Sequence, residues 1–477
     1  MDLGTRARSA LRWSAGGKLT GQLFTWAMTL IVIRLLTPED YGLMAIAVLF
    51  IQFLMLLNEF GLGAVLVHRK NLDEETKRKI FGVILLINTT FFIIINIAAT
   101  WIADFFHEKE LILIIHVLSI QFIISAFEIV PVAMLERELN FKKKSLVYLG
   151  ASVVGGTTTL VLALYDFGVW SLIWGNLTVI TLQVCGINIV SPFLKLPSFN
   201  FKGMMSIMSF GWLVTLERAM WFFYTQADIL IVGKILGKEI LGVYSVAMHL
   251  ASLIMHKTGG ILYEVAFPTF SRANEAPGEV AGYFLKAVRL MSFISFPIFF
   301  GMSSIAPELV GVVLGEKWKS AGMVLMILAL VMPLRMLSNI FPPVLQGVGR
   351  PGQSVVNLII GLIVMPIAFW FGARWGILGV SIAWLIGFPL VFMMAASRSI
   401  AFVGVNMKEF LVAIIPPALT SSLMYAVIMG VKVFISGDDT SVFRLLILIL
   451  VGALTFIPLA LTVHRSQFRE VREFFKR

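Results

Sequence analysis

Runs of mostly apolar residues recur along the whole of this chain, and each is long enough to cross a membrane as a helix, which takes about 20 residues. A soluble domain is roughly one quarter charged, whereas only 14% of these 477 residues are charged and 58% are hydrophobic. So few charges cannot cover a water-facing surface of that size. A helix satisfies its backbone hydrogen bonds internally, as lipid requires. The sequence therefore predicts an all-α integral membrane protein.

The apolar runs number fourteen, an even number that places both ends of the chain on one side of the membrane. The basic start of the chain leads into the first run without a small-residue cleavage site, so we interpret that run as an uncleaved helix. The expected spans are residues 14–36, 41–65, 80–103, 111–135, 145–165, 168–190, 204–233, 240–266, 284–305, 320–345, 354–372, 376–396, 409–431 and 442–463.

Basic residues indicate the orientation of these spans, because Lys and Arg collect in the short loops on the cytoplasmic side. Most of the 38 Lys and Arg residues fall on one side, including those at 69–79 and 137–144 and those of the tail after Arg465. Both termini are therefore expected in the cytoplasm. The same topology accounts for most of the net charge of +11, so no nucleic-acid partner is expected.

The chain repeats itself at an offset of 200 residues. When residues 25–50 are aligned with residues 225–250 without gaps, nine of the 26 positions are identical. Two unrelated stretches of this composition share about two or three. The identities include Glu39 with Glu239 and Gly42 with Gly242.

This repeat predicts the architecture, because 200 residues contain six spans and an even number keeps two repeats parallel in the membrane. We expect a six-helix lobe over residues 1–200, a pseudo-symmetric six-helix lobe over 201–400, and two extra helices with a basic cytoplasmic tail over 401–477. Two lobes around a central cleft are typical of transporters, which bind substrate between the lobes and expose it to each side in turn.

Ionisable residues inside the predicted spans cost at least ~2.5–3.5 kcal/mol each at mid-membrane, so each indicates a partner, a water-filled cavity or a function. Lys18 and Arg218 are 200 residues apart, so the repeat gives both lobes a cation at an equivalent place. Because Arg and Lys suit phosphate, we interpret the intramembrane cations as substrate-binding residues of a cationic central cavity. They are Arg218, Lys257, Arg335 and Lys18.

Carboxylates inside the spans leave a second interpretation open. Structural ion pairs of Glu217 or Glu264 with Arg218 or Lys257 explain the same charges through packing alone, and Lys18 can reach the headgroups. If the carboxylates serve transport, the candidate ion-coupling residues are Asp228, Glu264 and Glu59.

Two further polar features lie in the spans. In the eighth span a polar stripe at helical spacing comprises Ser245, His249, Ser252 and His256. Packing histidines are more common than ligands at such places. Glu128 is a further carboxyl, in the fourth span.

Catalytic and nucleotide-binding motifs are absent from the sequence, which has no Walker lysine loop, HExxH, CxxC or GxSxG. We therefore expect no enzyme, no cofactor and no metal site. ATP-driven transport by this chain alone is not expected either, and a gradient of H⁺ or Na⁺ is the expected source of energy.

Several short segments resemble a known family. They are residues 34–42 (RLLTPEDYG), 59–64 (EFGLGA), 136–142 (ERELNFK), 168–172 (GVWSL), 228–237 (DILIVGKILG) and 242–247 (GVYSVA). Together they are similar to the polysaccharide-exporting branch of the MOP superfamily, the Wzx-type flippases, and most of all to exporters of colanic-acid and teichuronic-acid polysaccharides. The resemblance extends over residues 1–400.

The resemblance implies a flippase that moves undecaprenyl-diphosphate-linked oligosaccharide units across the bacterial inner membrane by alternating access, for export of a cell-surface polysaccharide. Family members line the cavity with basic residues, a role that Arg218, Lys257, Arg335 and Lys18 fit here. The implied partners are the lipid-linked oligosaccharide, membrane lipids, a polysaccharide polymerase and chain-length machinery. Related lipid II flippases carry Arg on helices 1, 2 and 8, whereas the first two helices here carry Lys18 and Glu59, so lipid II is not the expected substrate.

Two other functions fit parts of the sequence. A cation-coupled multidrug antiporter of the same superfamily needs an anionic or aromatic cavity, which Glu59, Asp228 and Glu264 favour and the intramembrane cations oppose. A membrane polysaccharide polymerase or ligase needs a sizeable outside loop with convergent Arg, His or carboxylates. The longest outside segment, near residues 307–320, is short.

Overall fold

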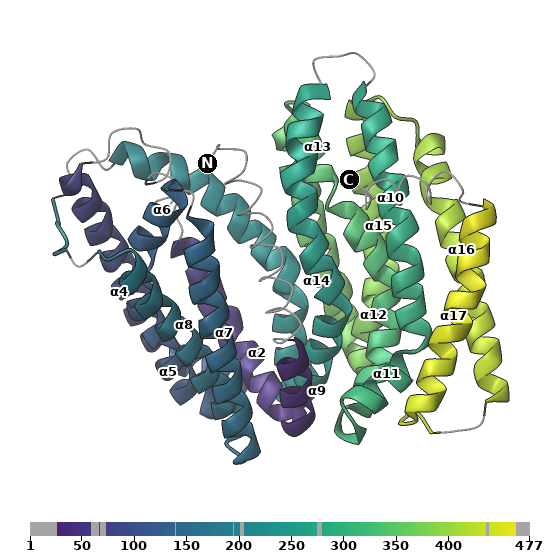
Figure 1. The fold of residues 1–477 in the computed structure, drawn as a ribbon, viewed down its shortest axis with the longest axis horizontal. Helices are drawn as coiled ribbons and strands as arrows, with labels where there is room; N and C mark the ends of the chain where they lie inside the picture. The colour runs from purple at the N-terminus through teal and green to yellow at the C-terminus, as the bar shows by residue number, and fades with distance from the viewer. Residues whose placement is uncertain are drawn as a thin grey trace. The chain divides into compact units, whose positions relative to one another are not determined.

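The computed structural model describes residues 26–58, 66, 73–138, 140–193, 195–200, 205–273, 279–435 and 438–463. Within these ranges the side chains of 205–215, 254, 256–269 and 271–273 are not described. Every regular element in the described part is a helix (Figure 1). The predicted all-α fold is therefore confirmed.

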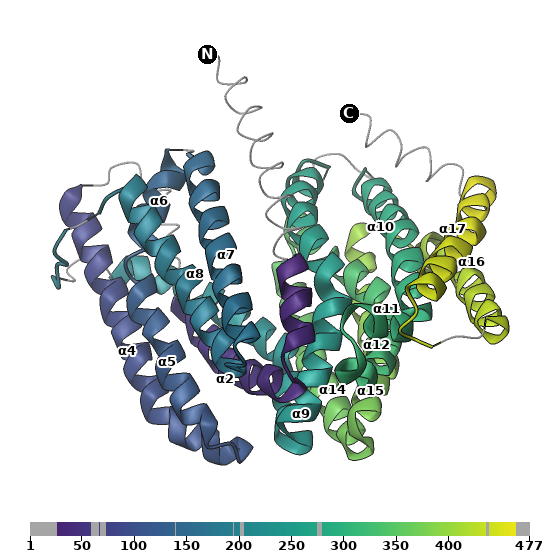
Figure 2. The ribbon, with the colours of Figure 1, turned by 60° about the horizontal axis from the view of Figure 1, so that its bottom comes forward.

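The described residues form two compact units, which divide between Gly242 and Val243. The helices of unit 1 are Trp26–Leu35, α2 (Pro38–Asn58), α4 (Glu74–Phe106), α5 (Glu110–Ser125), α6 (Ile129–Arg137), α7 (Phe141–Leu164), α8 (Val169–Val190) and the first part of α9 (Met205–Ala273). In this unit α7 packs against α8, α4 against α5, and α5 against both α2 and α8 (Figures 1 and 2).

Unit 2 contains the remainder of α9 and the helices that follow it. They are α10 (Glu279–Ser304), α11 (Ala306–Val313), η1 (Glu316–Trp318), α12 (Lys319–Ser338), α13 (Phe341–Gly347), α14 (Pro351–Gly372), η2 (Ala373–Trp375), α15 (Gly376–Val403), α16 (Met407–Phe434) and α17 (Val442–Val463). Here α12 packs against α10 and α15, and α16 lies between α10 and α17. The two extra helices thus attach to the rest of unit 2 mainly through α10, and α17 also packs against α11.

The boundary between the two units falls inside α9. This one long helix covers two predicted spans, residues 204–233 and 240–266. The predicted turn between them is a break at Gly237, whose φ of 84° and ψ of 174° are non-helical. Glycine adopts such a positive φ without a steric penalty. At the equivalent corner of the first repeat, Asp40 accepts hydrogen bonds from the backbone N–H and the hydroxyl of Thr37, at 2.9 and 2.6 Å. The two corners therefore use different local chemistry.

The fourth predicted span, residues 111–135, is broken in the structure. Helices α5 and α6 pass the length and hydropathy requirements of a membrane span together, but they are bent by 43°. In the described residues, nine helices are long and apolar enough to cross a membrane, or ten when this broken pair counts as one span. The total of fourteen spans and the lobe boundaries at 200 and 400 stay predictions.

The outer surfaces of both units are apolar. Trp101 is 72% exposed, Leu164 61% and Phe434 87%, and large exposed apolar surfaces of this kind mark contact with lipid or a partner. The interior of unit 2 is also apolar and rich in rings, with Phe284 and Phe410 stacked at 6.1 Å between centroids. Apolar spans and an apolar exterior identify a multi-pass membrane protein.

Candidate functional site

An aromatic platform in unit 2 is built around Trp384 of α15. Its indole is 1% exposed, and its centroid lies 5.0 Å from the ring of Phe369 on α14 and 5.7 Å from that of Phe388. The indole Nε1–H donates a 2.7 Å hydrogen bond to the hydroxyl of Tyr244, which is fully buried on α9. Because a buried indole N–H needs such an acceptor, helices α9, α14 and α15 together fix the orientation of the ring.

Arg335 holds its guanidinium against this platform. The residue is half-buried in the last turn of α12, two positions after Pro333. Its guanidinium carbon lies 4.3 Å from the Trp384 ring centroid, well within the ~6 Å of a cation–π contact. Its Nη1 lies 3.3 Å from the sulfur of Met248, one turn after Tyr244 on α9. A thioether is a weak acceptor, so these neighbours position the cation without neutralising it.

The charge of Arg335 sets it apart from other half-buried cations. No carboxylate of the described residues lies within ion-pairing distance of its guanidinium, whereas Lys238, Lys432 and Arg444 each pair with at least one. A guanidinium has five N–H donors, and its planar fork matches the oxygens of phosphate. A cation with this much unused donor capacity, held rigidly inside a membrane protein, can bind an anion.

The polar stripe predicted on α9 runs beside this platform, and two of its side chains can be described in detail. The Ser252 hydroxyl donates to the Met248 carbonyl oxygen of its own helix at 2.8 Å. The Ser245 hydroxyl is buried and has no hydrogen-bond partner in the part of the chain that the structure describes. The side chain of His256 is not described.

Two predicted site residues lie in unit 1. Arg218 is on an exposed face of α9, between the exposed residues Leu216 and Trp221. Asp228 lies nearly three turns further along the same helix, is 2% exposed, and accepts a 2.8 Å hydrogen bond from the backbone N–H of Ile229. Asp228 is therefore a buried carboxylate, and its role as an ion-coupling residue stays a prediction.

The remaining predicted site residues fall outside what can be described. Lys18 and Glu59 lie outside the described residues, and Lys257 and Glu264 lie on the α9 backbone with undescribed side chains. Their assignments stay predictions. Tyr244, Met248 and Trp384 are not among the site residues that the sequence predicts. Tyr244 and Trp384 are 140 residues apart, and nothing in the spacing of either residue predicts their contact.

A second charged group joins the repeat-related corners of unit 1. The Lys238 Nζ lies 3.1 Å from a carboxylate oxygen of Glu39 and 3.0 Å from one of Glu108. Burial alone lowers the pKa of this lysine, but the hydrogen bonds to Glu108 and Glu39 outweigh it and raise its pKa above the ordinary value. These charges satisfy one another, so they hold helices together and do not form a binding site.

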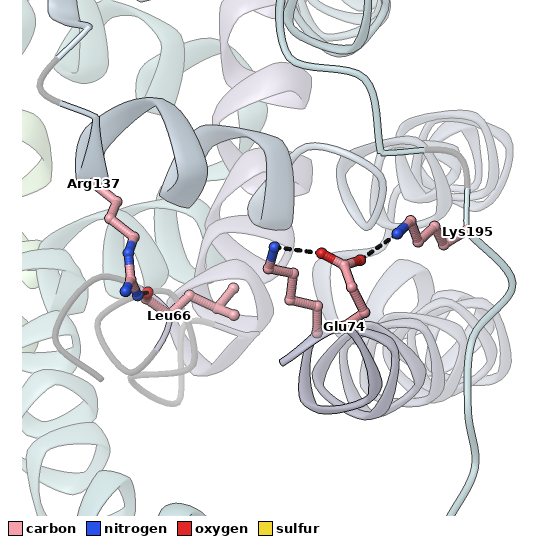
Figure 3. A network of polar contacts seen from close by, with 5 residues as sticks. Leu66, Glu74, Arg137 and Lys195 are labelled. Carbon is pink, nitrogen blue, oxygen red and sulfur yellow. Dashed lines mark hydrogen bonds and ion pairs between the residues drawn. The ribbon is translucent and has the colours of Figure 1, made fainter. Parts of the chain in front are cut away.

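Cations of the predicted inside loops are likewise tied to neighbouring helix ends (Figure 3). Glu74 forms ion pairs with Lys195 and, at 2.8 Å, with Lys77, and the Arg137 Nη1 donates to the Leu66 carbonyl oxygen at 3.3 Å. The ion pair of Glu74 with Lys195 joins α4 to the segment after α8, and the hydrogen bond of Arg137 joins α6 to Leu66. The basic residues that indicate topology therefore have structural partners.

A third charged group lies in unit 2, in the outside segment that sequence analysis describes as short. Glu308 of α11 is 1% exposed and pairs with Lys432 at 2.6 Å and with Arg444 at 3.3 Å. Its neighbours come from the end of α16 and the start of α17. This carboxylate is fully engaged in holding the extra helices, which leaves no carboxylate pair for a polymerase in this segment of the described chain.

The sequence of this chain is similar to those of known polysaccharide biosynthesis proteins. A family described as polysaccharide biosynthesis protein matches residues 31–323. The teichuronic acid biosynthesis protein TuaB of Bacillus subtilis is 25% identical over 421 residues, which cover 85% of each chain. The succinoglycan biosynthesis transport protein ExoT of Rhizobium meliloti is 24% identical over 355 residues, which cover 74% of this chain and 72% of ExoT.

The fold also matches a solved structure. The lipid II flippase MurJ in its inward closed conformation superposes with a TM-score of 0.72, over 95% of this chain and 99% of MurJ, at 13% sequence identity. At that identity the likeness concerns the fold alone. It confirms the predicted helical fold. The family match over residues 31–323 shows that this chain belongs to the polysaccharide biosynthesis protein family.

Proposed function

We propose that this protein is a flippase that moves oligosaccharide units linked to undecaprenyl diphosphate from the inner to the outer leaflet, by alternating access. The observation that carries this proposal is the Arg335 guanidinium, stacked at 4.3 Å on Trp384 with no carboxylate of the described residues beside it. A diphosphate is the charged part of such a lipid. The rest of the lipid, a long apolar chain, is suited to the surrounding bilayer.

Arg335 is well suited to a diphosphate for two physical reasons. Its fork of N–H donors can bind two phosphate oxygens at once. Its ring platform and the Met248 sulfur hold the side chain in place before the substrate arrives, which lowers the entropy lost on binding. We also propose substrate-binding roles for Arg218, Lys257 and Lys18, the other cations of the predicted spans.

Ion coupling is part of the proposal. A gradient of H⁺ or Na⁺ would return the empty carrier, and Asp228, Glu264 and Glu59 are the proposed carriers of the ion. The burial of Asp228 supports its inclusion. We further propose that the protein lies in the bacterial inner membrane with both termini in the cytoplasm, and that it works beside a polysaccharide polymerase and chain-length machinery.

An antiporter for organic cations is the competing function. A binding site for a cation needs an unpaired carboxylate or an open ring face. In the described part of unit 2, Glu308 is paired by two cations and the Trp384 face is occupied by Arg335. The guanidinium would repel a cationic substrate, so these observations favour an anionic one.

A deletion strain tests the function. Loss of this protein should stop export of the cell-surface polysaccharide and make lipid-linked units accumulate in the inner leaflet. Arg335→Ala should fail to restore export. Arg374→Ala is the matched control, because that guanidinium also stacks at 4.3 Å on a tryptophan, Trp370, but at an exposed turn. Unchanged export with loss of dye efflux would replace this proposal with the antiporter.

A further inference from the structure

Glu128 is a carboxyl group placed at a break in a membrane span. It lies between α5 and α6, which are bent by 43° where they meet. The 16 residues of α5 extend over about 24 Å at 1.5 Å per residue, which is less than the ~30 Å thickness of the hydrocarbon core. The break and Glu128 therefore fall inside the membrane.

The neighbours of Glu128 in the chain are apolar, and some of them are buried. Ala126 and Val130 are fully buried in a hydrophobic cluster that includes Phe81 of α4, and Ile129 packs against the same cluster. The Glu128 side chain itself is half-buried beside it. Ionised carboxylates are rare in such surroundings, and one found there is by default a candidate functional group.

The polar contact that Glu128 makes comes from α7. The Tyr148 hydroxyl donates a 2.6 Å hydrogen bond to Oε1 of Glu128. The nearby cation, Lys144, pairs with Glu136 at 2.6 Å and lies 5.4 Å from the Tyr148 ring centroid. Among the described residues Glu128 therefore has a hydrogen-bond donor and no ion pair. Its carboxylate carries a charge that Lys144 does not neutralise.

The other elements that pack against α6 bring no further charge to this carboxyl in the part of the chain that the structure describes. Helix α8 contributes the amide of Asn188, whose Nδ2 donates to the Phe127 carbonyl oxygen at 2.9 Å. Helix α4 contributes Phe81, whose centroid lies 5.6 Å from that of Phe127. The titratable and charged groups around Glu128 are thus Tyr148, Lys144 and Glu136.

We infer that Glu128 is a proton-binding site of the transport cycle, which is neutralised when it takes up a proton and charged when it releases one at the break between α5 and α6. The carboxylate accepts one proton from water and becomes the carboxylic acid. The Tyr148 hydroxyl can both donate and accept a hydrogen bond, so the pair persists in either state. The charge-assisted hydrogen bond from Tyr148 stabilises the ionised carboxylate by about as much as the apolar surroundings destabilise it. The charged and the protonated forms of Glu128 are therefore both accessible.

A proton fits this site better than a sodium ion. A metal ion needs several oxygen ligands, but the carbonyl oxygens at the break already accept hydrogen bonds. The Ser125 oxygen accepts from the Glu128 N–H at 3.0 Å, the Glu128 oxygen accepts from the Val132 N–H at 3.0 Å, and the Phe127 oxygen is bonded to Asn188. The position at the break also allows proton binding to change the conformation. Glu128 lies where α5 and α6 meet, so a change of its charge can alter the angle between these two helices.

Infrared difference spectroscopy tests proton binding directly, on the purified full chain in liposomes. A pH change should produce a carboxylic-acid band that Glu128→Gln removes. Tyr148→Phe should move its titration midpoint to higher pH, because the hydroxyl stabilises the charged form. Glu136→Gln, which removes the neighbouring paired carboxylate, should leave the band in place. A band that persists in Glu128→Gln, or a midpoint unmoved by Tyr148→Phe, would overturn the inference.

The role in transport rests on the proposed flippase function and needs its own measurement. In cells, Glu128→Gln should weaken the dependence of polysaccharide export on the proton gradient, read as export with and without a protonophore. Export by Glu128→Gln that collapses with the protonophore as the wild type does would overturn the coupling role. Unchanged export in a strain lacking the whole protein would instead refute the flippase function, while the infrared result would stand.

Discussion

Gly42 and Gly242, which the internal repeat relates, pack reciprocally against each other's corner. A Cβ on Gly42 would lie 1.8 Å from the carbonyl oxygen of Lys238, and a Cβ on Gly242 would lie 1.7 Å from that of Pro38. Because Gly42 and Gly242 are 200 residues apart, and so are Pro38 and Lys238, the contact has local two-fold pseudo-symmetry. Glycine is needed at both places because two backbones touch there.

Alanine at either glycine should therefore destabilise the protein. Gly42→Ala or Gly242→Ala forces the corners apart, and overpacking of this kind costs about 1–3 kcal/mol. Thermal unfolding of the purified protein in detergent measures the effect as a lower midpoint. Gly150→Ala is the matched control, because nothing lies within 4 Å of a Cβ there, and alanine improves a helix interior by about 1 kcal/mol. Equal midpoints for Gly42→Ala and Gly150→Ala would contradict the contact.

The ion pairs of Lys238 hold the same two corners together. Lys238→Met removes both pairs and should lower stability by about 1 kcal/mol, since exposed pairs contribute 0.2–1 kcal/mol each. Lys319→Met is the control, because its pair with Glu316 spans 3.8 Å between exposed side chains, and it should change little.

The stability lost in Lys238→Met should depend on pH in one direction. The pKa of Lys238 is raised in the folded protein, so its stabilisation is fully present below the lysine pKa of the unfolded chain and is lost as the pH rises through the raised folded value. Wild type and Lys238→Met should therefore differ by a constant amount at neutral pH and converge in strong alkali. A difference that grows with alkalinity would exclude this pairing.

Removal of the buried carboxylate of Glu308 should be far more damaging. Glu308→Gln removes the counter-charge of Lys432 and leaves Arg444 only its 3.9 Å ion pair with Asp439, and breaking a buried pair from one side costs about 3–5 kcal/mol. The unfolding midpoint should fall sharply, whereas Glu316→Gln, at an exposed pair, should shift it little. A mild effect of Glu308→Gln would mean that the extra helices are held by apolar contacts alone.

The hydrogen bond between Trp384 and Tyr244 should couple these two residues. Tyr244→Phe leaves a buried indole N–H without its acceptor, at a cost of about 1–3 kcal/mol. Trp384→Phe removes the donor and the ring platform of Arg335. Because the two changes remove one bond, the double variant should be less destabilised than the sum of the single variants. Additive effects on unfolding would show that the bond contributes nothing.

Apolar periodicity and one repeat were enough to predict the helical class and most helix positions. They also predicted a turn between residues 233 and 240, where the structure has the break at Gly237. The break of the fourth span was not predicted, because residues 126–130 contain neither glycine nor proline. The site was predicted only in part. Arg335 is visible in the sequence as a charge in an apolar run, but its platform brings together residues 140 apart, and no local pattern encodes such a contact.

The central claim is that the protein moves a diphosphate-linked oligosaccharide lipid across the membrane with the help of Arg335. The most direct measurement uses liposomes that contain the purified protein and a labelled undecaprenyl-diphosphate oligosaccharide, and follows how fast inner-leaflet lipid becomes accessible to an impermeant glycosidase. The wild type and Arg374→Ala should expose the lipid at the same rate, and Arg335→Ala should do so about 10- to 100-fold more slowly, the loss of one hydrogen bond to a charged group. Equal rates for Arg335→Ala and the wild type would contradict the account.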